Sequence, residues 1–363
     1  MRNLIAAGLI MLGSMASAQT QISKYQPGMT PEGAVYYLPK TALRIVVQVE
    51  KTTYTPGDFC KYSERYLRIK NVEKEPTESY KVTSITETSF GVADKSKCYA
   101  VKYNPKNATA NITLADDGTL LAINADAIQT ETPAKFTPAP KSKAVNPRQF
   151  MSEEILAAGS TAKMAELTAL EIYDIRDSKN QLTRGQADFM PKDGEQLKIM
   201  LNQLDAQDRA LTQLFTGTVT KDTTEHVFIY YPDKEVNRQV LFRLSSHLGI
   251  VDHDDLSGVP YYISIEDLHS VPANTMPTEE SKKKKGKTEK DIQDGIYVNI
   301  PGKIKATIAR GNDNMASFEI QTAQFGSTEL LSGDLFNKRF TTHLTLNPKT
   351  GAVAKIEAEQ PKK

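Results

Sequence analysis

Several stretches of the chain alternate apolar and polar residues with a period of two, and this pattern constrains the fold most. In TALRIVVQVEKTTY (residues 41–54), the apolar side chains of Leu43, Ile45 and Val47 fall on one face of an extended strand, and the charged side chains fall on the other. A sheet with one buried and one wetted face is typically antiparallel. Similar patterns recur up to residue 130 and again after residue 218.

Between these two regions the apolar period changes to three or four residues, which predicts helices. Ser160 and Asp193 stand where the side chain of an N-cap accepts a hydrogen bond from the first turn, and Gly217 stands where the second helix ends. A loop of about a dozen residues between the helices favours an antiparallel hairpin. The predicted fold class is therefore α+β, with two mainly antiparallel β modules flanking a helical hairpin.

The 363 residues, of which 39% are hydrophobic and 25% charged, suit a folded chain of two or three packed units. The predicted divisions are a signal peptide at 1–18, an N-terminal β domain at 30–130, a Pro-rich linker at 131–150, a helical hairpin at 151–217, and a C-terminal β domain at 218–358 with a mobile Lys-rich loop at 277–292.

The two β regions contain similar segments. GAVYYLPKTALRIVVQV (residues 33–49) resembles DGIYVNIPGKIKATIAR (residues 294–310), with Pro39 beside Pro301, and each region closes with a hairpin pattern. The similarity suggests two related β modules, although a chance match explains so short a pattern nearly as well.

The N-terminus has the pattern of a secretory signal. Arg2 precedes an apolar run, and Ala16-Ser17-Ala18 forms a small-x-small cleavage site before Gln19. No later segment reaches the roughly 20 apolar residues that a transmembrane helix needs. We expect an exported protein in the periplasm or associated with the outer membrane, without a transmembrane segment.

The charge balance excludes one class of partner. The chain has 45 basic and 44 acidic residues, and because Arg2 is the only charged residue of the signal, the mature chain has 44 of each. A neutral protein lacks the electrostatic attraction on which nonspecific nucleic-acid binding depends, so no nucleic acid is expected. The Lys-rich run at 281–290 is flanked by acids, which favours a solvated loop over a patch for anionic lipid or polysaccharide.

Two cysteines, Cys60 and Cys98, remain in a chain that is expected to be exported, and an oxidising compartment favours a disulfide between them. The bridge would close a loop of 39 residues, worth roughly 3 to 4 kcal/mol in the chain-entropy model. Their spacing differs from the C-x-x-C of redox-active pairs.

The most suggestive cluster for metal binding is VDHDDLSG, with Asp252, His253, Asp254 and Asp255. The oxygen ligands suit Ca²⁺, and the histidine suits Zn²⁺. Adjacent residues point in different directions, however, and the spacing is not that of an EF-hand, so a solvated turn is the preferred interpretation and no cofactor is expected.

Asp208 falls in the middle of the apolar stripe of the second predicted helix. We expect it to pair with a basic residue of the neighbouring helix, Arg176 or Arg184; a functional acid is the alternative.

The chain shows none of the common catalytic signatures, such as H-E-x-x-H, G-x-S-x-G or a phosphate-binding loop. Of its five histidines, His226 and His343 lie in strand patterns and are predicted to be ordinary strand residues. One modification signal is Asp222-Thr223-Thr224, which resembles the acceptor of periplasmic O-glycosylation in Bacteroidetes, with Thr223 as the acceptor.

YYLPKTALRI, RDSKNQLTRGQADFMPKDGEQLK and FRLSSHLGIVDHDDLSGVPYYI together resemble a family of exported Bacteroidetes proteins known only as a domain of unknown function. The resemblance implies a cell-envelope protein and brings no activity. We therefore predict a non-enzymatic envelope protein that binds or assembles with an envelope protein partner. The alternative is a periplasmic hydrolase acting on envelope glycan or peptide, which would unite His253 and Asp255 with a Ser or Glu in one cleft.

Overall fold

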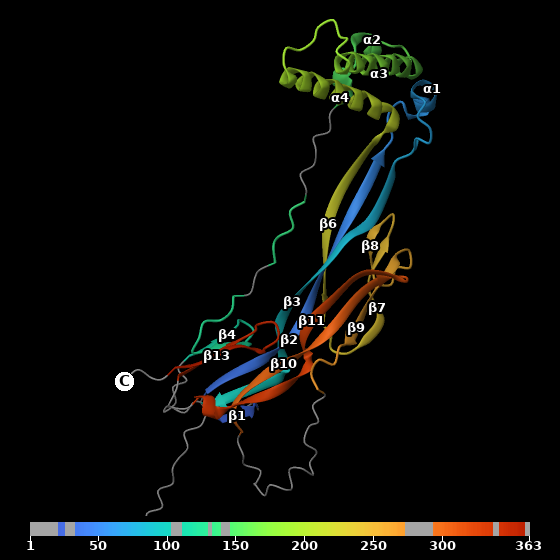
Figure 1. The fold of residues 1–363 in the computed structure, drawn as a ribbon. Coiled ribbons are helices and arrows are strands. Elements are labelled where there is room, and N and C mark those ends of the chain that lie inside the picture. Colours follow the sequence, from blue (N-terminus) through green and yellow to red (C-terminus); the bar gives the residue numbers. More distant parts are fainter. Residues whose placement is uncertain are drawn as a thin grey trace, which may run out of the picture.

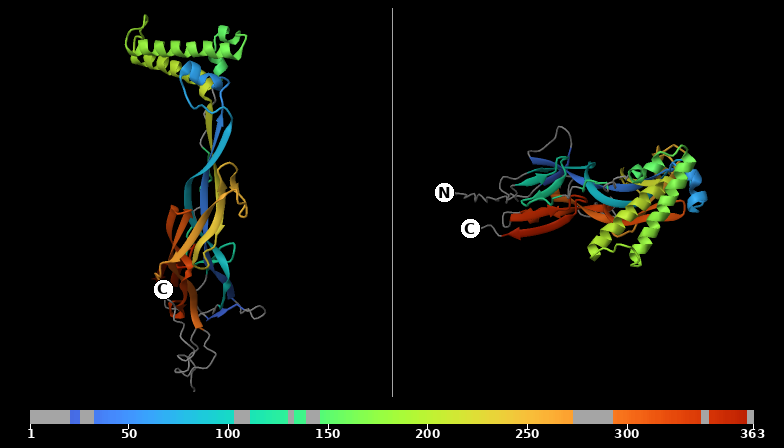
Figure 2. Two further views of the ribbon diagram at one scale, coloured as in Figure 1. Left: turned by 90° about the vertical axis from the view of Figure 1, so that its right-hand side faces the viewer. Right: turned by 90° about the horizontal axis from the view of Figure 1, so that it is seen from above.

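The computed structural model describes residues 21–25, 33–102, 111–129, 133–138, 146–272, 293–336 and 341–359. The molecule is elongated, with the helices gathered at one end and the strands making up the rest (Figures 1 and 2). The α+β class predicted from the sequence is confirmed. The predicted signal peptide and Lys-rich loop lie outside the described residues.

The strands are β1 (Gln21–Lys24), β2 (Gly33–Thr55), β3 (Thr77–Lys102), β4 (Ile112–Leu114), β5 (Leu120–Ile123), β6 (Thr218–Tyr230), β7 (Val236–Ser245), β8 (Gly249–Val251), β9 (Val259–Asp267), β10 (Gln293–Arg310), β11 (Asp313–Ser332), β12 (Thr341–Leu346) and β13 (Val353–Glu359). The α-helices are α1 (Ser63–Leu67), α2 (Glu153–Leu156), α3 (Thr161–Thr183) and α4 (Gly194–Thr216), with 3₁₀ turns η1 (Cys60–Tyr62), η2 (Pro147–Phe150) and η3 (Gly333–Phe336).

All strand pairs within the sheets are antiparallel. β6, β2 and β3 form one three-stranded sheet, which we call the stalk, and β1 links it to a second sheet of β11, β10, β9, β7 and β8. A separate four-stranded sheet has the order β13-β12-β5-β4. Strands from the two predicted β regions therefore share sheets, since β2 pairs with β6 and β5 pairs with β12.

The largest core lies between the stalk and the second sheet. The residues predicted to face inward on β2, namely Leu43, Ile45 and Val47, are buried there against Ile304 and Ile308 of β10. Burying each such side chain contributes roughly 1.5 to 3 kcal/mol. The alternation in the sequence thus fixed the buried face of β2 correctly. A second core joins the first residues of β2 and β10 and the last residues of β3 to the four-stranded sheet.

The helices form a third compact unit, which we call the head: residues 56–76, from the loop between β2 and β3, and residues 146–217. The hydroxyl of Ser160 accepts from the amide of Lys163, and the carboxylate of Asp193 accepts from that of Gln196, so both predicted N-caps are confirmed. Gly217 ends α4 with a φ of 76°, which a residue with a side chain rarely adopts. The head core comes from both segments: Phe59, Leu67, Ala165, Ala169, Ile172, Ile175, Leu211, Leu214 and Phe215.

The stalk holds the head away from the rest of the molecule (Figure 1). The 23 residues of β2 extend over roughly 75 Å at about 3.3 Å per residue. β3 and β6 accompany β2 to its end, where Thr55 lies opposite Thr218 and Tyr54 lies opposite Thr77. The hydroxyl of Tyr54 then donates to the carbonyl of Thr216 at the end of α4.

The long hairpins β2–β3 and β10–β11 have the same pairing register from Gly33–Lys102 and Gly295–Ser332 as far as Val46–Thr86 and Ile308–Ala316, and they differ beyond these pairs. In each hairpin, a stretch in which the first strand advances by three residues is paired with a stretch in which the second strand advances by six. Both hairpins therefore carry the same bulge in the second strand. The matching pairs are Gly33 with Lys102 and Gly295 with Ser332, Tyr37 with Cys98 and Asn299 with Thr328, and Lys40 with Val92 and Gly302 with Thr322.

The short hairpins that follow also correspond. The pairs are Ile112 with Ile123 and Leu344 with Ile356, Thr113 with Ala122 and Thr345 with Lys355, and Leu114 with Leu120 and Leu346 with Val353. Each turn docks in the same way: Tyr37 donates its amide to the carbonyl of Gly118 at 3.0 Å, and Asn299 donates to Gly351 at 3.1 Å. We call β2–β5 the N module and β10–β13 the C module; their strand order and register are the same.

Candidate functional site

The four residues of the predicted metal cluster lie in a hydrogen-bonded turn after β8. The amide of Asp255 donates to the carbonyl of Asp252 at 3.0 Å, and the ring Nδ1 of His253 lies 3.1 Å from a carboxylate oxygen of Asp254. Hydrogen bonds from the amide and hydroxyl of Ser257 lower the pKa of the Asp255 carboxyl. The turn therefore satisfies its own polar groups.

These four side chains do not converge on a common point. All are exposed, and within the described ranges no group of three or more His, Cys, Asp or Glu side chains is placed to hold a metal ion. The guanidinium of Arg243 donates hydrogen bonds to the carbonyl groups of His253 and Gly258 at 2.6 and 3.1 Å, which holds the turn in place. The arrangement gives the Ca²⁺ or Zn²⁺ hypothesis no support.

Asp208 of α4 pairs with Arg176 of α3, one of its two predicted partners. The Nε and Nη2 groups of Arg176 donate to Asp208 at 3.1 and 3.0 Å, and the hydroxyl of Thr212 donates to the same carboxylate at 2.9 Å. A two-pronged pair of this kind fixes the relative position of two helices. Lys179 and Asp205 form a second bridge between the same helices. The carboxylate of Asp208 is thus structural.

The predicted disulfide between Cys60 and Cys98 is wrong, because both cysteines are free. Cys60 belongs to the head, whereas Cys98 lies opposite Tyr37 near the other end of the β2–β3 hairpin. The 18 residues from Tyr37 to Thr55 separate the two positions by roughly 60 Å along the strand. A disulfide needs Cα atoms within about 7 Å. The rule that exported cysteines pair could not reveal this distance.

Thr223, the predicted glycosylation acceptor, lies in β6 opposite Glu50 of β2 and is half-buried. Its neighbour Thr224 is exposed and lies near the ring of His226 at 3.2 Å. β6 is the edge strand of the stalk, and of this motif Asp222 and Thr223 are partly exposed and Thr224 is exposed. Modification of Thr223 stays a prediction.

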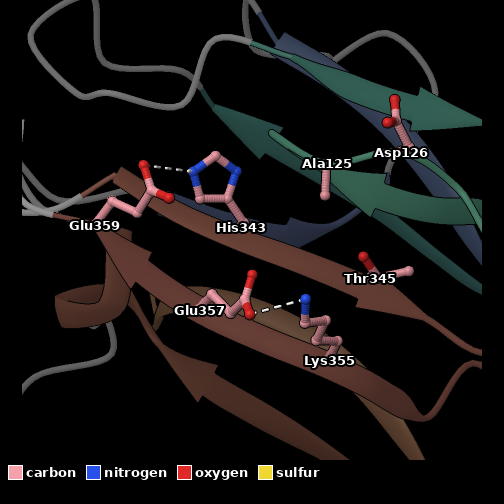
Figure 3. Close-up of a pocket in the computed structure, with 7 residues that line it drawn as sticks. All are labelled: Ala125, Asp126, His343, Thr345, Lys355, Glu357 and Glu359. Carbon is pink, nitrogen blue, oxygen red and sulfur yellow. Dashed lines mark ion pairs between the residues drawn. The ribbon is translucent and has the colours of Figure 1, made fainter.

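A shallow hollow of about 320 Å³ lies on one face of the four-stranded sheet (Figure 3). It is lined by Ala125, Asp126, His343, Thr345, Lys355, Glu357 and Glu359. The Nδ1 atom of His343 contacts the carbonyl of Asn124, and its Nε2 atom lies 4.0 Å from a carboxylate oxygen of Glu359. Lys355 and Glu357 form an ion pair at 2.8 Å.

The residues that line this hollow form no Ser–His or Cys–His pair. The 4.0 Å separation between His343 and Glu359 exceeds a hydrogen bond, and the seven lining residues include no Ser or Cys nucleophile. The carboxylate of Glu359 is largely exposed, so water screens its charge. Sequence reasoning treated His343 as a strand residue and missed its neighbours, since they come from two hairpins more than two hundred residues apart.

A larger hollow of about 1050 Å³ lies between the outer face of the stalk and the segment that leads toward the head. Its apolar wall includes Phe90 and Ile229 from the stalk and Ile128 and Pro133 from the segment, with Arg44 as a charged group. The ammonium of Lys40 lies 4.7 Å from the ring centre of Tyr231 nearby. The residues that line it include the hydroxyl groups of Thr88 and Ser89 but no His, Asp or Glu beside them.

The head carries exposed apolar side chains on the part of the helical hairpin farthest from the stalk. Phe189 in the connecting loop is 88% exposed, and Ile199 in α4 is 66% exposed. Met190 and Met200 are exposed beside them in the sequence, and Leu170 and Tyr173 of α3 are exposed nearer the stalk. Contiguous exposed apolar side chains often mark protein-binding surfaces. The sequence predicted the helices but gave no sign that this part is uncovered.

Comparison with family models identifies the chain. A model described as "Domain of unknown function (DUF4831)" matches residues 32–354. The chain belongs to the DUF4831 family. Comparisons with curated proteins and with solved structures gave no match. In the described residues of this DUF4831 protein, no helix is both long enough and apolar enough to cross a membrane.

Proposed function

We propose that this DUF4831 protein is a non-enzymatic binding or assembly component of the cell envelope. In this proposal the protein is exported through its N-terminal signal and binds a protein partner through the head. The observation that supports it is the exposure of Phe189 and Ile199 on a head held at the end of a long β stalk.

The energetics favour a protein partner. Covering the side chain of Phe189 would contribute roughly 1.5 to 3 kcal/mol, and aromatic side chains commonly act as anchors of interfaces. The two helices of the hairpin, of which α4 carries Ile199, are held together by the pair between Arg176 and Asp208, so their relative position does not have to be ordered on binding. A rigid pair of helices with an apolar tip suits a groove or helix of another protein.

The hydrolase alternative has no comparable support. It requires His253 and Asp255 in one cleft, but the carboxylate of Asp255 binds Ser257 and the ring of His253 lies against Asp254. Both belong to an exposed turn and line none of the hollows described above.

Site-specific photo-crosslinking in intact cells tests the binding surface. A photoreactive residue at position 189 should capture a partner of defined mass, and the same residue at position 305, an exposed site on β10, should not. The variant Ile199→Ser should reduce the yield at position 189 without changing the helix content of the protein. Equal capture at both positions, or none at either, would contradict the proposal.

Export is tested separately by the N-terminal sequence of the protein recovered from envelope fractions. We expect it to begin at Gln19. A chain that retains residues 1–18 and stays in the cytoplasmic fraction would refute export while leaving the binding surface open to its own test.

A further inference from the structure

The four-stranded sheet ends in two different kinds of strand. Its order is β13-β12-β5-β4, and the shared register makes β12 the counterpart of β4 and β13 the counterpart of β5. The two kinds therefore alternate across the sheet. The outer strand at one edge, β13, is the counterpart of β5, and the outer strand at the other edge, β4, is the counterpart of β12. The two free edges therefore match the two strands, β5 and β12, that already pair at the centre of the sheet.

The central contact joins the two modules. β12 of the C module pairs antiparallel with β5 of the N module, with Leu344 opposite Ile123 and Thr345 opposite Ala122. This contact, together with the core beneath it, leaves Ile123, Ala122 and Leu344 with no exposed surface.

β13 has the same place in its hairpin as β5, yet no strand among the described residues pairs with its outer edge. All seven of its residues are exposed; Ile356, the counterpart of the fully buried Ile123, is 42% exposed and Val353 is 37% exposed. At the other end of the sheet, Leu114 of β4 is also exposed. No strand in the described part of the chain pairs with the outer edge of either β13 or β4.

We propose that copies of this chain associate edge to edge, with the β4 edge of one copy pairing with the β13 edge of the next. The contact repeats the pairing of β12 with β5, and it places Ile112 opposite Ile356 and Thr113 opposite Lys355 of the second copy. One chain cannot make it alone, since its own β4 and β13 are separated by two strands, or roughly 14 Å at about 4.8 Å per strand.

The charges on β13 are compatible with this pairing. Lys355, Glu357 and Glu359 project from the face of the sheet, where they line the hollow with His343, rather than along its edge (Figure 3). β4 itself has the residues Ile-Thr-Leu and no charge, so neither Lys355 nor Glu357 would meet a like charge. Side chains on a strand stand perpendicular to the sheet and leave the backbone edge accessible.

The contact is confined to the sheet edge. Where the modules also pack face to face, Leu43 of the N module is buried, but its counterpart Lys305 in the C module is exposed. The outer face of the C module is therefore too polar to repeat the core contact. An asymmetric contact that leaves both edges free at its ends continues into open chains or closes into rings.

Crosslinking tests the register of the contact. In a Cys98→Ser background, Thr113→Cys protein is mixed with Lys355→Cys protein and treated with a short bismaleimide. We expect a covalent dimer that contains one copy of each variant. Two controls are Thr345→Cys with Lys355→Cys in one chain, which should close internally, and Thr113→Cys mixed with Glu319→Cys, which should give no dimer. Closure of the internal control without a mixed dimer would overturn the proposal.

Charge variants test the same contact without a reagent. Thr113→Lys should weaken self-association measured by sedimentation about two- to fivefold, because like charges directly opposite each other on neighbouring strands repel. Thr113→Glu should strengthen it by a similar factor, and Lys355→Glu should restore association to Thr113→Lys. A wild-type protein that sediments as a monomer at every concentration, or a double variant that is not rescued while its helix and strand content is unchanged, would refute the contact.

Discussion

The β2–β3 and β10–β11 hairpins share one register of strand pairing over most of the C-module hairpin, including the same bulge, but they bury opposite faces. Leu43 of β2 points into the core, and Lys305, its counterpart on β10, is exposed. On β10 the buried residues are instead Ile304, Ala306 and Ile308. The modules consequently pack with the Leu43 face of β2 against the Ile304 face of β10, and these are not corresponding faces of the two modules. Side-chain polarity decides which face is buried once the backbone register is set.

The two bulges also differ in the space that they leave for a side chain. In the C module the backbone comes so near that a Cβ atom on Gly326 would lie 1.8 Å from the carbonyl oxygen of Ile300. The counterpart of Gly326 in the N module is Ser96, whose side chain is exposed and donates to Asp94 at 2.6 Å. The same register thus tolerates a side chain in one module and excludes it in the other.

The largest expected effect contrasts the two faces. Leu43→Ala should destabilise the protein by about 2 to 5 kcal/mol, because it leaves a cavity in the main core, whereas Lys305→Ala should stay within about 0.5 kcal/mol of the wild type. Urea denaturation measures both. Similar losses at the two positions would show that the faces are not opposed as described.

The bulges permit a reciprocal exchange. Gly326→Ser should destabilise by about 1 to 3 kcal/mol, because the new Cβ atom has to displace backbone, and Ser96→Gly should cost less than about 1 kcal/mol. Thermal denaturation of the two variants compares them directly. If Gly326→Ser were as stable as the wild type, the close approach at this bulge would be incorrect.

A smaller effect concerns Glu87 of β3, whose counterpart on β11 is Ser317. Burial raises the pKa of the Glu87 carboxyl, with the charge of Lys349 opposing the shift, and its Oε1 atom is buried without a hydrogen bond among the described residues. A raised pKa means that the folded state holds the proton more tightly than the unfolded state. Stability is therefore lost as the pH rises from the usual carboxyl range through the folded pKa.

Glu87→Gln should consequently be more stable than the wild type at neutral pH, by less than about 1 kcal/mol because solvent screens the half-exposed group. The gain should vanish at a pH below the usual carboxyl range. Ser317→Ala provides the control, with no pH-dependent difference. Urea denaturation across this pH range would contradict the assignment if Glu87→Gln were destabilising at neutral pH.

The last prediction is that a reductant has no effect on thermal stability. Because Cys60 lies in the head and Cys98 lies near the far end of β3, adding a reductant should leave the melting temperature unchanged. A bridge across this loop would stabilise by roughly 3 to 4 kcal/mol and its reduction would lower the melting temperature clearly. Two free thiols counted by mass after unfolding without a reductant would agree with the structure.

Much of the local structure could be predicted from the sequence. The alternation around Leu43 and Ile45 identified the buried face of β2, and the residue types at Ser160 and Asp193 identified the two N-caps. The position of Asp208 on the helix wheel predicted a pair with Arg176 or Arg184, and the structure has the pair with Arg176. All of these depend on residues within a few positions of one another or on one helix–helix contact between neighbours in the chain.

The candidate site was less accessible from the sequence. The residue types of the acidic turn at 252–255 suggested a metal site, but among the described residues no three His, Cys, Asp or Glu side chains are placed to hold a metal ion. The hollow around His343 and the uncovered tip at Phe189 had no signal, since each is defined by what lies next to it in space.

The sequence by itself determined the spacing of the apolar residues and the helix caps, and hence which segments are helices and which are strands. These features follow from the geometry of a single helix or strand. Only the tertiary structure decided that residues 56–76 would complete the head, that β5 would pair with β12, and that Cys60 and Cys98 would lie far apart. Such pairings join segments separated by many residues, and they are selected by the total apolar surface that the whole chain buries rather than by any one pattern in it.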